Sequence, residues 1–453
     1  MKKSPLLPPQ LFFNFLLIAA AAALRHPAAG SAAHFPKEAL PTKSGYLTVN
    51  STTGSAIFYT YYEAQNPHNP QTAILIWLQG GPGCSSMLAN FYELGPWLMN
   101  PETLTLDPNP GSWNTKFGLL FLDNPIGSGF SIAPSFQEIP RNQHDVAKHL
   151  FTAIKKFISL DSSFKTRPLY ITGESYAGKY VPGLGYYILK KNPFLPAEER
   201  VNLAGLAIGN GLTHPATQVG THAENAYNLG LINDKQKAFL ERIQFETIGF
   251  VKSGKWGEAT DARSRVLKTL QNMTGLATLY DFRRLIPYQD DVVAKFLNNV
   301  DIKKALGVNE SLVFEVCSDL VEKALKEDVM KSVKYMVEFL VKNMRVLLYQ
   351  GQCDLRDGVV STLAWVKKMR WDGIREFLEA DRKVWRVDEK LAGYVQRWEN
   401  LSHAVVVNAG HLVPTDQPVN SRVMIEDWVL GKGSFGEGKE IEEVFCDVCS
   451  GSV

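Results

Sequence analysis

Short apolar runs alternate with amphipathic segments along the first half of the chain. Residues 73–78 are continuously apolar and residues 118–123 nearly so, which is typical of strands buried on both faces of a parallel sheet. Residues 143–158 instead repeat apolar positions at helical spacing. The same patterns predict strands at 56–62, 169–172 and 203–209 and a helix at 177–190. This alternation of strand and helix predicts an α/β fold with a parallel sheet and crossover connections.

The pattern changes after residue 211 and returns near residue 345. The intervening residues are largely helical in pattern and more charged, and strand character resumes at 345–350 and 404–408 before a closing helix at 418–430. We therefore predict one sheet domain in two parts, interrupted by an insertion that caps the carboxyl ends of the strands, where α/β sites lie. The expected divisions are 31–212 and 344–431 for the sheet domain, 213–343 for the helical cap insertion, and 432–453 for a tail.

Residues 1–30 have the pattern of a secretion signal. Lys2 and Lys3 precede an apolar run at 11–24, and small residues follow at 28–33. The run is shorter than the roughly 20 residues that a membrane span needs, so we expect cleavage and no span after signal removal. N-x-S/T acceptors behind such a signal predict glycosylation; they are Asn50, Asn272, Asn309 and Asn400.

Composition excludes several classes of function. The 453 residues include 48 Lys and Arg against 46 Asp and Glu, which gives no basic surface for nucleic acid. Neither a zinc-type H-E-x-x-H motif nor a phosphate loop with its Lys-Ser/Thr occurs, so we expect no metal and no cofactor. Of the five cysteines, an odd count leaves at least one unpaired in an oxidising compartment.

Ser175 has the context of a catalytic nucleophile. Gly173 and Ala177 flank it with small residues, a predicted strand precedes it and a predicted helix follows it. This is the arrangement of a nucleophile elbow, in which a sharp turn presents the serine hydroxyl above the sheet. A serine hydroxyl needs a base to take its proton, so the motif predicts acyl-transfer chemistry and calls for partners later in the chain.

The partners are expected in the order carboxylate, then histidine, each at a strand end. Asp354 follows the strand at 345–350 directly, and we favour it over Asp357, which reads as a helix start. Of the two later histidines, His403 opens the strand at 404–408 and His411 follows its end, so His411 is the expected base.

Backbone N–H groups should stabilise the oxyanion that forms in acyl transfer. The N–H of Tyr176, directly after the nucleophile, is one expected donor. Gly80 and Gly81 follow a buried strand, and their lack of side chains lets the backbone approach a substrate oxygen closely.

Several blocks of the sequence together resemble the signatures of the serine carboxypeptidases, from about residue 44 to 430. The blocks are Trp77-Leu-Gln-Gly-Gly-Pro-Gly-Cys-Ser-Ser86, Phe91-Tyr-Glu-Leu-Gly-Pro96, Gly173-Glu-Ser-Tyr-Ala-Gly178, Ile208-Gly-Asn-Gly211 and Gly410-His-Leu-Val-Pro414. The resemblance implies an α/β-hydrolase fold with a helical cap, in a lysosomal, vacuolar or secreted exopeptidase with an acidic optimum. Its partners would be peptides with a free C-terminal carboxylate, and a homodimer is left open.

Residue by residue, the resemblance implies further roles. Ser175, Asp354 and His411 match the triad, and Gly81 and Tyr176 match the oxyanion donors. The group that binds the substrate's terminal carboxylate matches Gln79, Gly80, Glu93 and Glu174. Position 79 is Asn in most of the family, although a subgroup resembling the vitellogenic-like carboxypeptidase also has Gln, whose extra methylene displaces the amide. Cys84 matches a family cysteine bridged to the insertion, where Cys317 is the candidate, and Cys353 is then the expected free thiol.

Two acidic residues suggest a physical origin for the acid optimum. Ionised, Glu93 and Glu174 would repel a substrate carboxylate, whereas protonated they can donate hydrogen bonds to it. Two other functions are open on the same fold: an acyltransferase that uses sugar esters, and a non-catalytic binding protein. Such acyltransferases tend to have Asp where this chain has Glu174, and the complete set of triad residues disfavours a purely binding role.

Overall fold

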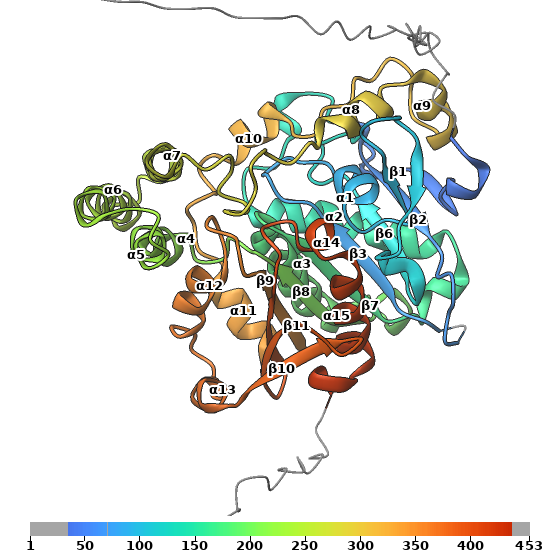
Figure 1. Cartoon of the computed structure of the whole chain (residues 1–453). Coiled ribbons are helices and arrows are strands. Elements are labelled where there is room, and N and C mark those ends of the chain that lie inside the picture. Colours follow the sequence, from blue (N-terminus) through green and yellow to red (C-terminus); the bar gives the residue numbers. More distant parts are fainter. Residues whose placement is uncertain (1–34, 70, 437–453) are drawn as a thin grey trace, which may run out of the picture.

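The computed structural model describes residues 35–69 and 71–436. Its centre is a ten-stranded sheet with mixed strand directions (Figure 1). The sheet order is β1 (Lys43–Asn50), β2 (Ser55–Tyr62), β6 (Gly118–Leu122), β3 (Ile74–Leu78), β7 (Leu169–Glu174), β8 (Leu203–Gly209), β9 (Arg345–Gly351), β12 (Leu401–Val406), β11 (Lys390–Trp398) and β10 (Arg382–Val387). The six inner strands from β6 to β12 are parallel, and antiparallel pairs close both sides. The predicted parallel α/β sheet is thus present.

The inner strands are apolar on both sides because helices cover both faces of the sheet. Along β3, Ile74 and Ile76 pack into the core under α2 (Gln143–Ser159) and α3 (Ala177–Lys191). Leu75 and Trp77 alternate with them and pack into a second core with α15 (Pro418–Leu430). This alternation follows from the period of two along a strand.

The remaining helices lie mainly around the carboxyl ends of the parallel strands and in the long insertion. Their bounds are α1 (Ser86–Tyr92), α4 (Pro215–Gln218), α5 (His222–Asn228), α6 (Asp234–Lys252), α7 (Trp256–Thr274), α8 (Asp291–Leu297), α9 (Val300–Leu306), α10 (Asp319–Leu325), α11 (Lys334–Val341), α12 (Val359–Val366), α13 (Ile374–Glu379) and α14 (Val413–Asp416). A separate two-stranded sheet pairs β4 (Trp97–Met99) with β5 (Leu106–Pro108).

Residues 213–343 contain the helices α4 to α11, which lie in more than one group. Helices α5, α6 and α7 stand together at one side of the sheet, whereas α8 and α9 lie on the other side near β1 (Figure 1). The last of these helices, α11, packs against α3 beside the sheet. The division of the chain into a sheet domain and a cap stays a prediction, and the signal and most of the tail lie outside the described residues.

The sequence patterns missed three strands of the main sheet and both strands of the two-stranded sheet, and they misplaced one boundary. β1, β10 and β11 form the two sides of the sheet and carry many polar or charged residues, which is how edge strands avoid pairing with other chains. His403 lies within β12 rather than at its opening. There its buried ring bonds Gln350 at 2.7 Å, and burial lowers its pKa to about 4.

Candidate active site

Ser175 lies in a left-handed turn between a strand and a helix. β7 ends at Glu174, α3 begins at Ala177, and Ser175 itself has φ 61°. Its backbone N–H donates to Gly209 O at 3.0 Å, which ties the turn to the neighbouring strand β8. A positive φ is strained for a non-glycine residue, and such strain concentrates at functional sites. The local geometry is that expected of a nucleophile elbow.

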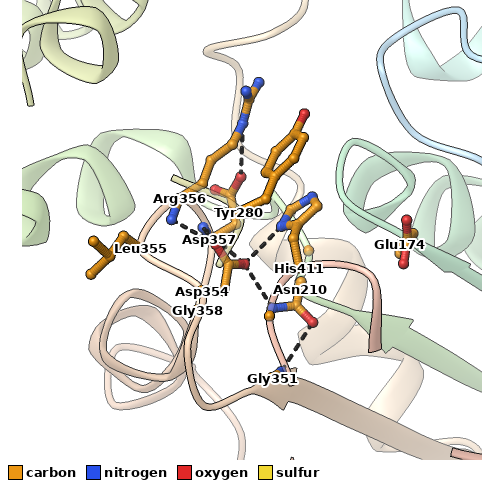
Figure 2. Close-up of polar contacts among 12 residues, drawn as sticks. Glu174, Asn210, Tyr280, Gly351, Asp354, Leu355, Arg356, Asp357, Gly358 and His411 are labelled. Atoms are coloured by element: carbon orange, nitrogen blue, oxygen red, sulfur yellow. Dashed lines mark hydrogen bonds and ion pairs between the residues drawn. The ribbon is translucent and has the colours of Figure 1, made fainter. Parts of the chain in front are cut away.

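Asp354 and His411 are in direct contact although 57 residues separate them. The Nδ1 atom of His411 lies 2.7 Å from Asp354 Oδ2, and both side chains are buried (Figure 2). The Nε2 atom of His411 is buried and has no hydrogen-bond partner among the described residues. A histidine held by a carboxylate through Nδ1 can use Nε2 as a base.

The competing carboxylate is engaged elsewhere. Asp357 lies 3.2 Å from the guanidinium of Arg263, and no hydrogen bond joins it to His411 within the described part of the chain. Ser175 likewise makes no direct hydrogen bond to His411 in that part. The structure therefore brings Asp354 and His411 together and sets Ser175 in a separate turn at the end of β7, which β8 separates from β9. Catalytic contacts of this kind commonly close only with substrate bound.

Asn210 joins the nucleophile side of the sheet to Asp354. Its Nδ2 donates to Asp354 Oδ2 at 2.7 Å, and its Oδ1 accepts from the N–H of Gly351 at 3.2 Å (Figure 2). It follows directly after Gly209, whose carbonyl holds Ser175. The sequence contains Asn210 in a family-like block, but nothing local indicates that its side chain reaches across to residue 354.

Tyr280 covers one face of the histidine. Its ring stacks on His411 at 4.4 Å between centroids and 12° between planes, and its carbonyl accepts from the N–H of His411 at 2.7 Å. This residue comes from the insertion, between α7 and α8. The sequence offers no spacing that would have identified it.

The glycine segment after β3 runs against the nucleophile turn. A Cβ added to Gly80 would lie 2.7 Å from both Ser175 Cβ and Tyr176 N, and Gly81 has φ +107°. Glycine is required at both positions, for close approach at one and for backbone conformation at the other. Gly81, Ser175 and Tyr176 line one cavity, so the two expected oxyanion donors and the nucleophile belong to the same space.

Gln79, Glu174 and Glu93 form a second group beside Ser175. The indole N–H of Trp77 donates to Gln79 Oε1 at 2.7 Å, which leaves the amide Nε2 to donate to Glu174 Oε1 at 2.9 Å. Both carboxyl oxygens of Glu93 and one of Glu174 are buried without a hydrogen-bond partner among the described residues. Both the oxygen and the nitrogen of the Gln79 amide are therefore hydrogen-bonded, and its N–H group points at the carboxyl group of Glu174.

Burial alters the acidity of both glutamates. Desolvation raises the pKa of Glu93 to about 8, and desolvation followed by the charge of Glu93 raises the pKa of Glu174 well above its ordinary value. Ionised carboxylates are costly in such surroundings, so the protonated forms persist to higher pH than in water. Neutral carboxyl groups can donate hydrogen bonds to a carboxylate.

The predicted disulfide joins Cys84 to Cys317, and Cys353 is free and buried. The other two cysteines, Cys446 and Cys449, lie outside the described residues. No group of His, Cys, Asp or Glu that could hold a metal occurs at 35–69 or 71–436, and none of the helices described there could cross a membrane. At Asn400 the amide Nδ2 donates to Val341 O at 3.0 Å, and glycosylation at the four acceptors stays a prediction.

Comparison with known proteins gives consistent matches over most of the chain. The serine carboxypeptidase family model matches residues 33–431. Serine carboxypeptidase-like 50 of Arabidopsis thaliana is 58% identical over 412 residues, which cover 90% of this chain and 92% of that protein. The probable serine carboxypeptidase CPVL of Homo sapiens is 34% identical over 412 residues, 88% of this chain and 85% of its own.

A solved structure shares the fold. The crystal structure of Kex1, a prohormone-processing carboxypeptidase from Saccharomyces cerevisiae, superimposes with a TM-score of 0.78 at 25% identity. The match covers 88% of this chain and 94% of that one.

Proposed function

The chain belongs to the serine carboxypeptidase family, with its α/β-hydrolase fold, and from that premise we propose that it removes C-terminal residues from peptides through an acyl-enzyme on Ser175. His411 acts as the base and Asp354 orients it. The N–H groups of Gly81 and Tyr176 stabilise the oxyanion. The reaction runs at acidic pH.

The acylation step follows from the contacts of His411. As Ser175 Oγ attacks the carbonyl carbon of the last peptide bond, its proton passes to His411 Nε2, which has no hydrogen-bond partner in the described structure. The carboxylate of Asp354, 2.7 Å from Nδ1, stabilises the imidazolium that forms. The imidazolium then protonates the leaving amine, and the free C-terminal residue departs.

Deacylation repeats the same proton path with water. His411 takes a proton from a water molecule, whose oxygen attacks the acyl carbon. Collapse of the second tetrahedral intermediate breaks the bond to Ser175 Oγ, which recovers its proton from Nε2. The products are a peptide shortened by one residue and a free enzyme.

One observation carries the exopeptidase part of the proposal. Glu174 directly precedes Ser175, is buried with Gln79 on one oxygen, and has a pKa well above its ordinary value. Gln79, Glu93 and Glu174, with the backbone at Gly80, would bind the terminal carboxylate when the acids are protonated. Because ionisation replaces donors with charges that repel the substrate, affinity should fall as pH rises.

The cellular setting belongs to the same proposal. A cleaved signal at residues 1–30, glycosylation at Asn50, Asn272, Asn309 and Asn400, and the Cys84–Cys317 disulfide are all consistent with a protein of the secretory pathway. Acid vacuoles, lysosomes and acidic extracellular spaces provide the pH that the buried glutamates require.

The test compares a blocked dipeptide with its C-terminal amide across pH. For the dipeptide, KM should rise as the pH increases through about 8, the pKa of Glu93, because the ionised carboxyl group repels the substrate carboxylate. The amide should bind poorly throughout and show no such rise, and E174Q should flatten the dipeptide profile. A flat KM for the dipeptide, or faster turnover of a glucose ester in the presence of an alcohol, would contradict the proposal.

A further inference from the structure

The cavity beside Ser175 is lined mainly by polar and charged side chains. It is small, about 60 Å³, and opens between the nucleophile turn and helices α7 and α10 of the insertion. Besides Gly81, Ser175 and Tyr176, its polar lining consists of Thr260, Arg263, Ser264, Glu322, Arg356 and Asp357. A space of this size holds a few water molecules or a short side chain, and its lining favours a polar one.

Two of the four charged residues that line the cavity form an ion pair with each other. Arg263 and Asp357 are both buried and lie 3.2 Å apart, so this pair is already compensated. Glu322 is exposed on α10, where water screens its charge. Arg356 also lies 3.8 Å from the carboxylate of Asp357, so this one carboxylate faces two guanidinium groups. Arg263, Arg356 and Asp357 together therefore leave one positive charge in excess at the cavity wall.

Arg356 is held in place but keeps unused hydrogen-bonding capacity. Its guanidinium packs over the ring of Tyr280 at 5.1 Å, and Nε lies 3.8 Å from Asp357 Oδ2, too far for a hydrogen bond. Nε is also buried without a hydrogen-bond partner within the described residues. Figure 2 shows the terminal nitrogens of Arg356 extending past Tyr280 and Asp357, away from the drawn residues.

The position of Arg356 indicates which side of the scissile bond it faces. Its own backbone N–H donates to Asp354 Oδ1 at 2.7 Å, which fixes it beside the catalytic carboxylate. Figure 2 places Arg356 and Glu174 on opposite sides of His411. If the leaving C-terminal residue binds at Glu174, as the proposed function requires, the cavity with Arg356 receives the residue on the acyl side.

We propose that Arg356 is a specificity-determining residue that binds an acidic side chain in the penultimate residue of the substrate. A guanidinium offers paired N–H donors that match the two oxygens of a carboxylate. The stack on Tyr280 presents these donors in a fixed direction beside Ser175. A penultimate Lys would meet a like charge there, and an apolar side chain would displace water from polar groups without replacing its hydrogen bonds.

The experiment measures kcat/KM for blocked dipeptides that share one C-terminal residue and differ in the penultimate one. At about pH 6, where a glutamate side chain is ionised, the wild-type enzyme should prefer penultimate Glu over Gln by about tenfold, with Lys slowest. R356Q should remove the preference for Glu over Gln, and R356K should retain part of it.

R265Q is the matched control. Arg265 lies on α7 two residues from Arg263, is half exposed, bonds Glu246 at 2.8 Å and does not line the cavity. R265Q should leave every ratio unchanged, and thermal melting of each variant establishes that it is folded. A wild-type enzyme that prefers Gln or Lys, or an unchanged Glu-to-Gln ratio in folded R356Q, would overturn the inference while hydrolysis of the dipeptides persists. Absence of hydrolysis for all of them, in the wild type, would instead overturn the proposed function.

Discussion

At the scale of single residues, the carboxylate of Asp354 is held on both of its oxygens. Oδ2 contacts His411 Nδ1 and accepts from Asn210 Nδ2, each at 2.7 Å, and Oδ1 accepts from the N–H of Arg356 at 2.7 Å. With rotation about the carboxylate suppressed, the histidine ring is fixed in one tautomer and one orientation. Asn210 is therefore a positioning residue in this account.

Removing the amide of Asn210 should slow the reaction more than it weakens binding. In N210G the left-handed φ of 43° is kept because glycine adopts it freely, while the bond to Asp354 is lost. A hydrogen bond to a charged group is worth about 1.5–3 kcal/mol, so kcat should fall about 10- to 100-fold with little change in KM. The measurement is steady-state kinetics on a blocked dipeptide.

Asn408 provides the control for that substitution. It also has a positive φ, of 56°, but its side chain is exposed and lies outside the site. N408G should leave kcat unchanged. Equal activity of N210G and the wild-type enzyme would contradict the positioning role.

The residues with local signatures were predictable, and those that act across the fold were not. Ser175 lies in a motif whose neighbours must be small, and His411 follows a strand end, so the sequence indicates both. The sequence around Asn210 and Tyr280 has no distinctive local pattern. Asn210 contacts Asp354, 144 residues away, and Tyr280 contacts His411, 131 residues away, and local periodicity cannot indicate such distant contacts.

At the scale of elements, the turn between β7 and α3 depends on the absence of side chains. A Cβ on Gly173 would lie 2.3 Å from Leu78 O and 2.8 Å from the Cβ of Ala177. The strand before the turn and the helix after it therefore approach each other more closely than any larger residue allows. Ala177, at the second flanking position, has only a methyl side chain, which keeps this approach possible.

Two glycine substitutions should have opposite effects. G173A should lower the melting temperature by several degrees and reduce activity, because Leu78 and α3 must move apart. In G183A, within α3, the nearest atoms lie at 3.6 Å, and the added methyl should raise stability by up to about 1 kcal/mol. Thermal melting of both proteins is the measurement, and an unchanged G173A would show that the turn has room.

The segment after α10 is fixed to α3 by a buried ion pair. Lys179 Nζ, in the first turns of α3, lies 2.7 Å from the carboxylate of Asp328, which follows α10 and also accepts from the hydroxyl of Tyr176 at 2.6 Å. Burial lowers the pKa of Lys179 to about 8. The carboxylate thus supports both the helix and the residue after the nucleophile.

Removing one member of this pair should destabilise the protein strongly. D328N leaves the charge of Lys179 buried without its counterion, which should cost about 3 kcal/mol or more in the free energy of unfolding. D261N breaks an exposed pair with Lys326 and should cost less than about 1 kcal/mol. Chemical denaturation compares the two, and equal losses would contradict the buried pair's role.

The sequence predicted the buried helices and strands better than the exposed ones. The inner strands and α2, α3 and α15 have clear patterns because one or both sides are covered by the core. β10 and β11 carry basic residues at irregular positions and have several exposed side chains, so their sequences do not show a strand pattern. The path of the insertion was not predictable, because short helices joined by polar loops carry no information about which surface they will cover.

At the scale of the whole molecule, the buried glutamates couple stability to pH. The pKa of Glu93 is about 8 in the folded state, against an ordinary value of 4.5. Between these values the folded chain holds more protons than the unfolded chain, so the free energy of unfolding falls as pH rises. The stabilising contribution is complete below about pH 4.5 and lost through about pH 8.

The melting temperature should therefore decrease between about pH 5 and about pH 8. E93Q, which mimics the protonated carboxyl group, should show a smaller decrease over the same interval. Differential scanning calorimetry of the two proteins in matched buffers is the measurement. Parallel curves for wild type and E93Q would mean that folding does not raise the pKa of Glu93.

The most direct test of the central claim is mass spectrometry of a peptide with a free C-terminus after incubation at about pH 5. The wild-type enzyme should release residues one at a time from that end and leave the corresponding peptide amide intact, while S175A should release nothing. Internal cleavage, equal processing of the amide, or release by folded S175A would contradict the account.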